Sequence, residues 1–287
     1  MKGHEFPSLY RSADELSLAS QRHFFLALKL HLITLVIAAG LSIVSIPHWS
    51  VAVFQLIVLL TALSCSIYMF AMRPDRLWYA GRAVAESIKT ISWRYVCRAE
   101  PYQGDDTSAR NDFRKTLKAI VDQNKEVCQA LTKYLDGVQI TPTMDEVRGK
   151  SLEERQNIYA LSRVADQLTW YAKKASFNRC MSKTFFWILI FVNAVAVGCA
   201  IFRIVYPGQS FWPTDVFVAA AASLLSWMQA KRFSEQAASY ALAANEIGFI
   251  KEQASLTRGE KEFSDFVGDA ENAFSREHTQ WIARKDV

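Results

Sequence analysis

The sequence predicts an all-α membrane protein, in which two transmembrane helical hairpins are continued by long heptad-patterned cytoplasmic helices. Three observations predict this fold class. The apolar residues gather in runs of membrane length, the basic residues flank these runs on one side, and the segment behind each hairpin keeps a 4,3 spacing of apolar residues. The 287 residues are therefore not patterned as one soluble core, along which apolar positions would be spread more evenly.

Four apolar runs define the predicted spans. We place these spans at about 24–46, 49–72, 184–205 and 211–230. The second run carries no charge and exceeds the roughly 20 residues that cross a hydrocarbon core, whereas the fourth is the weakest because Asp215 lies near one end. A single run of this kind could be a buried hairpin of a soluble core, but four runs arranged in two pairs favour a membrane.

The basic residues predict the orientation of the spans. Lysine and arginine side chains precede the first and third runs and follow the second and fourth, namely Arg22, Lys29, Arg73, Arg76, Arg82, Lys173, Lys174, Arg179, Lys183, Lys231 and Arg232. The turns at 47–50 and 206–213 contain neither residue type. Because positive residues concentrate on the cytoplasmic side of a membrane, both termini and the middle of the chain are expected to be cytoplasmic.

The segments that follow the hairpins are expected to form stalk helices, at 76–99 and 231–257. Their apolar residues recur with a 4,3 spacing, at Leu77, Gly81, Val84, Ile88, Ile91 and Tyr95 in the first and at Phe233, Ala237, Tyr240, Ala244 and Ile247 in the second. This spacing places one apolar seam along each helix for a partner helix. Pro74, just past the second span, predicts a bend.

The region between the hairpins predicts one helix, a linker and a second, longer helix. The first should run from about Ser108 to Leu135, with Asn124 in its seam either setting register against another asparagine or facing solvent. Residues 137–150 have the composition of a linker. Ser151 and Glu154 then form a capping box, which starts a helix that continues without a break into the third span, on the order of 80 Å long.

The chain divides into two similar halves. We assign the first repeat to 1–101, a cytoplasmic helix and linker to 102–150, the second repeat to 151–258 and a C-terminal cytoplasmic helix to 259–287. This last helix has apolar residues at Phe263, Val267, Ala270, Phe274 and Trp281. The stretch Ala13-Asp14-Glu15-Leu16-Ser17 resembles Ala165-Asp166-Gln167-Leu168-Thr169. Both halves enter the membrane from the same side, which disfavours a transporter built from inverted repeats.

The sequence carries no constellation typical of an enzyme, a cofactor site or a metal site. Arg148-Gly149-Lys150-Ser151 ends like a phosphate-binding loop, but Met144 stands where that motif needs its first glycine. The five histidines have no paired spacing and the five cysteines no CxxC spacing. The net charge of +5 comes mostly from the residues beside the spans, so it is weak support for nucleic-acid binding.

Polar residues at membrane depth are the remaining candidates for function. The pore-lining candidates are Thr34, Ser42, Ser45, Gln55, Ser66 and Asn193. Such residues can hold neighbouring helices together, or they can line a water-filled pore that several chains assemble. Asp215 is expected to cap a helix at the outer interface, and the alternative is a ring of charge that selects cations.

The stalk behind the first hairpin carries the pattern Trp78-Tyr79-x-x-Arg82-x-x-x-Glu86-Ser87-x-Lys89, followed by Trp93-Arg94-Tyr95. With the Ala-Asp-x-Leu-Ser stretch and the two-span hairpin, this pattern resembles the SLATT superfamily of bacterial membrane effector domains. The second half is similar in hydropathy but has Ala243, Glu246 and Lys251 in place of the basic pattern. The resemblance therefore implies two tandem copies, the second of them divergent.

The resemblance implies a homo-oligomeric, pore-forming effector of an anti-phage system in the bacterial inner membrane. Its signal would be a cyclic or short oligonucleotide made by an associated nucleotidyltransferase, and it would act by depolarisation. The candidates for binding such an anion are Arg82, Lys89, Arg94 and Arg98. Arg82 could instead anchor the stalk to the lipid surface. The alternative function is a non-conducting scaffold, whose coiled coils recruit cytoplasmic partners.

Overall fold

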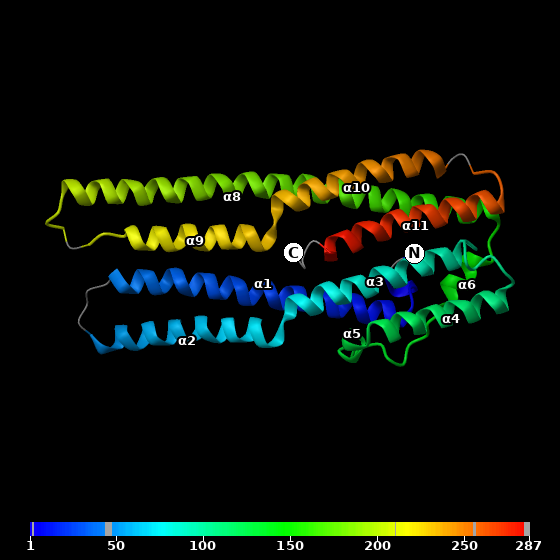
Figure 1. The fold of residues 1–287 in the computed structure, drawn as a ribbon, viewed down its shortest axis with the longest axis horizontal. Helices are drawn as coiled ribbons and strands as arrows, with labels where there is room; N and C mark the ends of the chain where they lie inside the picture. The colour runs from blue at the N-terminus through cyan, green and yellow to red at the C-terminus, as the bar shows by residue number, and fades with distance from the viewer. Residues whose placement is uncertain (2, 44–47, 210, 255–256, 284–287) are drawn as a thin grey trace. The chain divides into compact units, whose positions relative to one another are not determined.

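The computed structural model describes residues 1, 3–43, 48–209, 211–254 and 257–283, with side chains up to Ser275, and every element within these ranges is a helix (Figure 1). The expected all-α class is therefore confirmed. The chain forms two compact units. We call Arg22–Pro74 with Lys173–Tyr240 the hairpin unit, and Met1–Gln21, Asp75–Ala172 and Ala241–Val287 the bundle unit.

The helices α1 (Ser8–Ile43), α2 (Trp49–Met72), α8 (Asp166–Val205) and α9 (Thr214–Lys231) supply the hairpin unit. Among the described residues, three helical stretches are long and apolar enough to cross a membrane, at Ser8–Ile43, Trp49–Val96 and Leu152–Val205. They contain the second and third predicted spans and the first as far as Ile43, since residues 44–46 lie outside the described part. The fourth prediction, on α9, does not reach the same apolarity, because this 18-residue helix includes Asp215, Gln229 and Lys231.

Within the hairpin unit, α1 lies between α2 and α9 (Figure 1). The Gln55 amide of α2 donates to Ser42 Oγ of α1 at 2.9 Å, and the Ser223 hydroxyl of α9 donates to the Leu32 carbonyl at 3.4 Å. Large apolar side chains remain exposed on α8, with Phe191 at 68% and Phe202 at 59%. An apolar exterior of this kind is what a helix in contact with lipid requires.

Each hairpin ends at an arginine in the left-handed backbone conformation. Arg73 (φ 42°, ψ 53°) separates α2 from α3 (Pro74–Val96), and Arg232 (φ 49°, ψ 40°) separates α9 from α10 (Phe233–Ala254). This conformation ends a helix because the next peptide can no longer continue the ladder of hydrogen bonds. At Pro74, where we expected a bend, the structure has a break between two helices, and the second half makes the same break without a proline.

The bundle unit contains α3, α4 (Asp106–Gln123), α5 (Lys125–Gln129), α6 (Pro142–Arg148), α7 (Leu152–Tyr159), α11 (Glu260–Ala283), the 3-10 turn η1 (Gly3–Glu5), the π-helical segment η2 (Ala160–Ala165) and parts of α1, α8 and α10. The predicted seams are buried: Val84, Ile88 and Tyr95 on α3, and Phe263, Val267, Ala270 and Phe274 on α11. The side chain of Trp281 lies outside the described part. Apolar faces on short and long helices thus supply one common core.

The prediction of a single helix from Ser108 to Leu135 is wrong. α4 ends at Gln123, and Asn124 leaves the helical conformation with φ −122° and ψ 39°. The Asn124 side-chain amide donates to the Ile120 carbonyl at 2.8 Å. The asparagine side chain therefore donates to a carbonyl at the end of the helix and helps to end it. Short amide side chains often compete with the helical backbone in this way.

The prediction of a linker at 137–150 is also wrong, because this segment contains the helix α6. Thr141 caps this helix by accepting from the Met144 amide at 3.3 Å, and Pro142 occupies its first turn. Met144 is fully buried, so the segment is anchored in the core. Gly137 is required near Ser8, since a Cβ there would lie 2.5 Å from Ser8 Cβ.

The long helix that leads to the third span begins as expected. Ser151 and Glu154 form the capping box, and α7, η2 and α8 continue as one helical stretch of 54 residues, Leu152–Val205. The π-helical segment η2 inserts one wider turn, at Ala160–Ala165. Such bulges are often found where a helix carries a functional or tightly constrained side chain.

A close approach of α1 and α3 generates a first prediction. A Cβ on Gly81 would lie 3.3 Å from both the Ala13 carbonyl oxygen and the Ser17 amide nitrogen. Gly81→Leu should therefore destabilise the protein by about 1–3 kcal/mol through overpacking. The measurement is the thermal unfolding midpoint in detergent, followed by circular dichroism.

Gly248→Leu is the matched control, because a Cβ on this helical glycine of the same unit meets no atom within 4 Å. This control should leave the midpoint unchanged or raise it, since leucine favours the helix over glycine by about 0.8–1 kcal/mol. Equal midpoints for the two variants would show that the approach of α1 and α3 does not depend on Gly81.

Candidate functional site

The Ala-Asp-x-Leu-Ser stretch of α1 packs against the aromatic and basic pattern of α3. Ala13 is fully buried where it meets Gly81, and the Ser17 hydroxyl donates to the Trp78 carbonyl at 3.0 Å. Asp14 Oδ1 lies 3.5 Å from Arg82 Nη1. These two sequence patterns are therefore the two sides of one helix crossing.

The charged residues of α3 continue from this crossing into the interior of the bundle unit. Arg82 Nη2 lies 2.6 Å from the Glu86 carboxylate, whose side chain is 7% exposed. Burial lowers the pKa of Lys89, the next basic residue of the pattern, although Glu86 opposes this effect. Because buried charges are costly unless paired, these side chains are held by one another.

A buried ion pair joins η2 to α11. Arg163 donates from Nε to Glu271 Oε1 at 2.8 Å and from Nη2 to Oε2 at 2.7 Å, and the Tyr159 hydroxyl donates to the same carboxylate at 3.0 Å. The Arg163 and Glu271 side chains are only 2% and 0% exposed. The two parallel hydrogen bonds fix the orientation of the Arg163 guanidinium, and the carboxylate also balances its charge.

These two groups belong to a single charge network. Lys89 interacts with both Glu86 and Glu271, and Arg163 interacts with Glu86 as well as with Glu271. We define the network by its three carboxylates and three cations, Asp14, Glu86, Glu271, Arg82, Lys89 and Arg163. Its formal charge is zero, which is the condition under which a protein interior tolerates so many ionised groups.

A second group of arginines satisfies the carboxyl end of α3. Arg148 donates to the Tyr95 carbonyl at 2.7 Å, and Arg155 donates to the Cys97 carbonyl at 2.8 Å. The last carbonyls of a helix lack partners within the helix and carry its negative dipole end, so cations are favoured there. The hydrogen bond from Arg148 Nε, at 2.9 Å, lowers the pKa of the Asp106 carboxyl.

The four predicted nucleotide contacts do not converge on one site. Arg82 and Lys89 lie in the charge network, whereas Arg98 donates to the Arg148 carbonyl at 3.0 Å. Arg94 donates from Nη2 to Asn272 Oδ1 at 2.7 Å and to the Gly268 carbonyl at 3.1 Å. Arg94 Nε is buried without a hydrogen-bond partner.

Sequence reasoning did not identify Arg148, Arg155 and Arg163, which are all 2% exposed. The spacing of Arg155 and Arg163 was the available signal, because eight residues place two side chains near one face of a helix. Two arginines on one face call for carboxylates or carbonyls on the facing elements, whereas Arg148 ends the separate helix α6. Only the fold shows that these partners come from α3 and α11.

The predicted pore-lining residues of the first hairpin have partners inside that hairpin. The Thr34 hydroxyl donates to the His31 carbonyl at 2.7 Å, and Ser42 accepts from Gln55. Ser66 donates to the Ala62 carbonyl at 3.1 Å. These bonds agree with the packing interpretation for these residues.

Two pore-lining candidates remain. Asn193 on α8 donates to the Leu189 carbonyl at 2.8 Å within its own helix, and its side chain is otherwise exposed. Ser45 lies outside the described residues. The pore-lining role of these residues stays a prediction.

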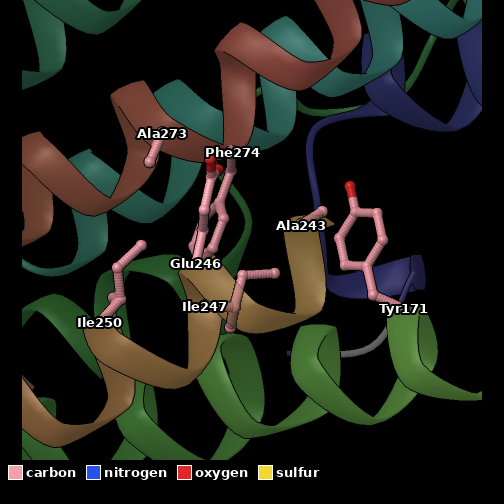
Figure 2. A pocket seen from close by; sticks show the side chains of 7 residues that line it. All are labelled: Tyr171, Ala243, Glu246, Ile247, Ile250, Ala273 and Phe274. Atoms are coloured by element: carbon pink, nitrogen blue, oxygen red, sulfur yellow. The ribbon is translucent and has the colours of Figure 1, made fainter. Parts of the chain in front are cut away.

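The bundle unit contains a small pocket between α8, α10 and α11 (Figure 2). Its lining is mostly apolar, and is made by Tyr171, Ala243, Glu246, Ile247, Ile250, Ala273 and Phe274. A volume of about 10 Å³ is at the lower limit for one water molecule, so this pocket does not admit a nucleotide base. Among the described residues, no group of three His, Cys, Asp or Glu side chains could hold a metal ion.

Two family models match consecutive parts of the chain. Residues 7–156 match the SMODS and SLOG-associating 2TM effector domain 3, and residues 159–281 match the SMODS and SLOG-associating 2TM effector domain 1. The chain belongs to the SLATT family. It contains two tandem SLATT domains, as the sequence resemblance implied. No curated protein and no solved structure matches this SLATT chain.

Family membership and the long apolar helices together establish a membrane protein. SLATT domains are two-span effectors associated with SMODS and SLOG nucleotide-signalling systems. The charge network crosses the border between the two SLATT matches, because Asp14, Glu86 and Lys89 lie in the first, whereas Arg163 and Glu271 lie in the second. The two domains therefore share one interior in the bundle unit.

The buried pair generates a second prediction. Glu271→Gln removes the carboxylate that pairs directly with the buried Arg163 charge, so it should lower the free energy of unfolding by about 3–5 kcal/mol. The double variant Arg163→Met with Glu271→Met should lose less, because both charges are removed together. Chemical unfolding of the detergent-solubilised protein measures both losses.

Arg76→Met provides the control, since Arg76 and Glu126 form an ion pair whose side chains are 62% and 82% exposed. Exposed pairs contribute about 0–1 kcal/mol. A double variant as unstable as Glu271→Gln would contradict the assignment of the loss to an unpaired charge.

Proposed function

We propose that this SLATT protein is an oligomeric, pore-forming effector of a bacterial anti-phage system. Its bundle unit senses a nucleotide-derived signal, and its hairpins conduct ions and depolarise the inner membrane. The observation that carries this proposal is the pair of consecutive 2TM effector matches, at residues 7–156 and 159–281. A chain that repeats a two-span effector has the elements needed to assemble a pore from few copies.

The proposal includes four spans, with both termini in the cytoplasm. Two 2TM domains support four spans, of which α9 is the least apolar. The basic residues at one end of each hairpin, which include Arg73 and Arg232, support a cytoplasmic position for these ends. The bundle unit would then lie where a soluble nucleotide reaches it.

Signal recognition is assigned to Arg94, because its guanidinium joins two helices and its Nε has no hydrogen-bond partner. Its guanidinium joins α3 to α11 through Asn272 and the Gly268 carbonyl. A phosphate bound by Arg94 would compete with these two partners, because an ionised acceptor makes a stronger hydrogen bond than a neutral one. Binding would then change how firmly α11 is held.

No chemical reaction or cofactor is part of the proposal. Two carboxylates of the bundle unit are held in structural pairs, Glu271 with Arg163 and Asp106 with Arg148. The second candidate function, a non-conducting scaffold, is favoured by the internal pairing of Gln55 with Ser42, because this pairing leaves fewer polar groups of the first hairpin for a pore.

A flux assay tests the proposed function. The full-length protein is reconstituted in liposomes that hold a potassium gradient, and flux is measured with and without cyclic dinucleotides, cyclic trinucleotides and short linear oligonucleotides. We expect one class of nucleotide to change the flux by altering the equilibrium between closed and open states. Silence under every condition, with insertion confirmed by protease protection, would favour the scaffold.

Arg94→Ala tests the sensing residue. It should shift the nucleotide concentration for half-maximal response upward by about tenfold or more, because a hydrogen bond to a charged group contributes about 1.5–3 kcal/mol. Arg114→Ala, at an exposed position on α4, is the control and should leave the response unchanged. An unchanged response for Arg94→Ala would remove this residue from the binding site.

A further inference from the structure

The helix α10 exposes two large apolar side chains in the bundle unit. Leu242 is 61% exposed and Phe249 is 69% exposed. Lipid does not account for this exposure, because α10 is not among the described stretches that are apolar enough to cross a membrane, and it carries acidic and basic side chains. Large apolar side chains that are exposed together outside a membrane mark a surface for another protein.

These two residues lie in the middle of the outward side of α10. At 100° per residue they fall about 20° apart around the helix, on the side away from the buried Ile247. Asn245 lies about 60° to one side of Leu242 and Glu246 about 40° to the other, and both are exposed. Glu246 also lines the small pocket between α8, α10 and α11 (Figure 2). We call Leu242, Asn245, Glu246 and Phe249 the α10 outer face.

The α10 outer face is complementary to a second copy of itself. When two such helices pack in parallel about a two-fold axis, each flank of one helix meets the opposite flank of the other. The Asn245 amide of each copy then lies beside the Glu246 carboxylate of the other, to which it can donate a hydrogen bond. In an antiparallel pair each flank would meet its own counterpart, so two Glu246 carboxylates would face and repel each other.

A membrane imposes the same direction of pairing. Copies of one chain that span a membrane with the same orientation are related by an axis along the membrane normal. Their equivalent helices therefore meet in parallel rather than antiparallel, unless these helices lie flat on the membrane. The polar flanks of α10 and the membrane thus favour one and the same arrangement.

The exposed area favours copies held in one membrane over a soluble partner. Leu242 and Phe249 each leave on the order of 100 Å² exposed, so two copies could bury roughly 400–500 Å² of apolar area there. A stable interface between soluble proteins buries about 1,200–2,000 Å². Copies in one membrane already share an orientation and are confined to a surface, so a smaller contact is enough to join them.

We infer that two copies of the chain pair through the α10 outer face, in parallel and in register. This inference deepens the proposed function, on whose oligomeric state it rests, because it names a surface that joins the copies. Leu242 and Phe249 of each copy pack against the same residues of the other, as the apolar positions of a parallel coiled coil do.

Disulfide crosslinking of the full-length protein in liposomes tests the pairing and its direction. Leu242→Cys and Phe249→Cys should each give a disulfide-linked dimer on mild oxidation, because in a parallel pair in register each thiol meets its own counterpart. A dimer that forms only when the two variants are mixed would show an antiparallel pair and overturn the inference.

Lys251→Cys is the matched control for crosslinking. Position 251 is exposed on the same helix but lies about 180° from Leu242 around it. This variant should therefore give no more dimer than the unsubstituted protein, whose five free cysteines set the background. As much dimer from Lys251→Cys as from Leu242→Cys would show random collision and overturn the inference.

Phe249→Asp tests the contact itself. Added to Leu242→Cys, it should lower the yield of dimer by about tenfold or more, because it removes apolar area and places two carboxylates opposite each other. The thermal unfolding midpoint should stay unchanged, since Phe249 is 69% exposed. Lys251→Asp, added to Leu242→Cys in the same way, should leave the yield unchanged. An equal yield for the two combinations would contradict a contact at Phe249.

The outcomes separate this inference from the proposed function. If neither cysteine variant gives a dimer above background, the pairing is overturned, and nucleotide-dependent potassium flux in the same liposomes would leave the pore proposal standing with another contact between copies. If the dimer forms in liposomes that conduct with no nucleotide, the pairing is supported and the pore proposal fails.

Discussion

The buried charge network is the constraint on which the bundle unit depends. Six charged groups from four elements interact in this network; the Asp14 and Arg82 side chains are 29% and 32% exposed, but Arg163 and Glu271 pair at full burial. Because an unpaired charge is far more costly there than at the surface, α1, α3, η2 and α11 have to arrive in one arrangement. Apolar seams alone would allow neighbouring helices to pack in several registers, since sliding one helix by a heptad places similar apolar residues opposite each other.

The same network joins the two SLATT domains of the chain. Each domain supplies a hairpin and a helix that follows it, and each makes the left-handed break at an arginine, at Arg73 and at Arg232. The first domain keeps the basic pattern of α3, whereas the second supplies Arg163 and Glu271 to meet it. The two halves therefore differ in residues that contact each other. This is possible because two copies within one chain need not form identical contacts.

The arginines that sequence patterns suggested as ligand contacts bind other groups of the protein itself. Arg82 holds Asp14 and Glu86, and Arg98 closes on the Arg148 carbonyl. The proposed signal would have to compete with these existing bonds. It would shift the equilibrium between two states only by its differential affinity for them.

The sequence by itself determined the membrane runs, the capping box at Ser151, the seams on α3 and α11 and the family, because these depend on local spacing and on hydropathy. Tertiary structure decided the rest. The short helix α6 at an apparent linker exists because Met144 finds a core, and α4 stops because Asn124 bonds its own backbone. The rotation of α9 about its axis is fixed in part by the contact of Trp227 with Phe25 of α1, about two hundred residues earlier. Contacts between residues so distant in the chain leave no periodic signal, since neither partner's spacing encodes the other.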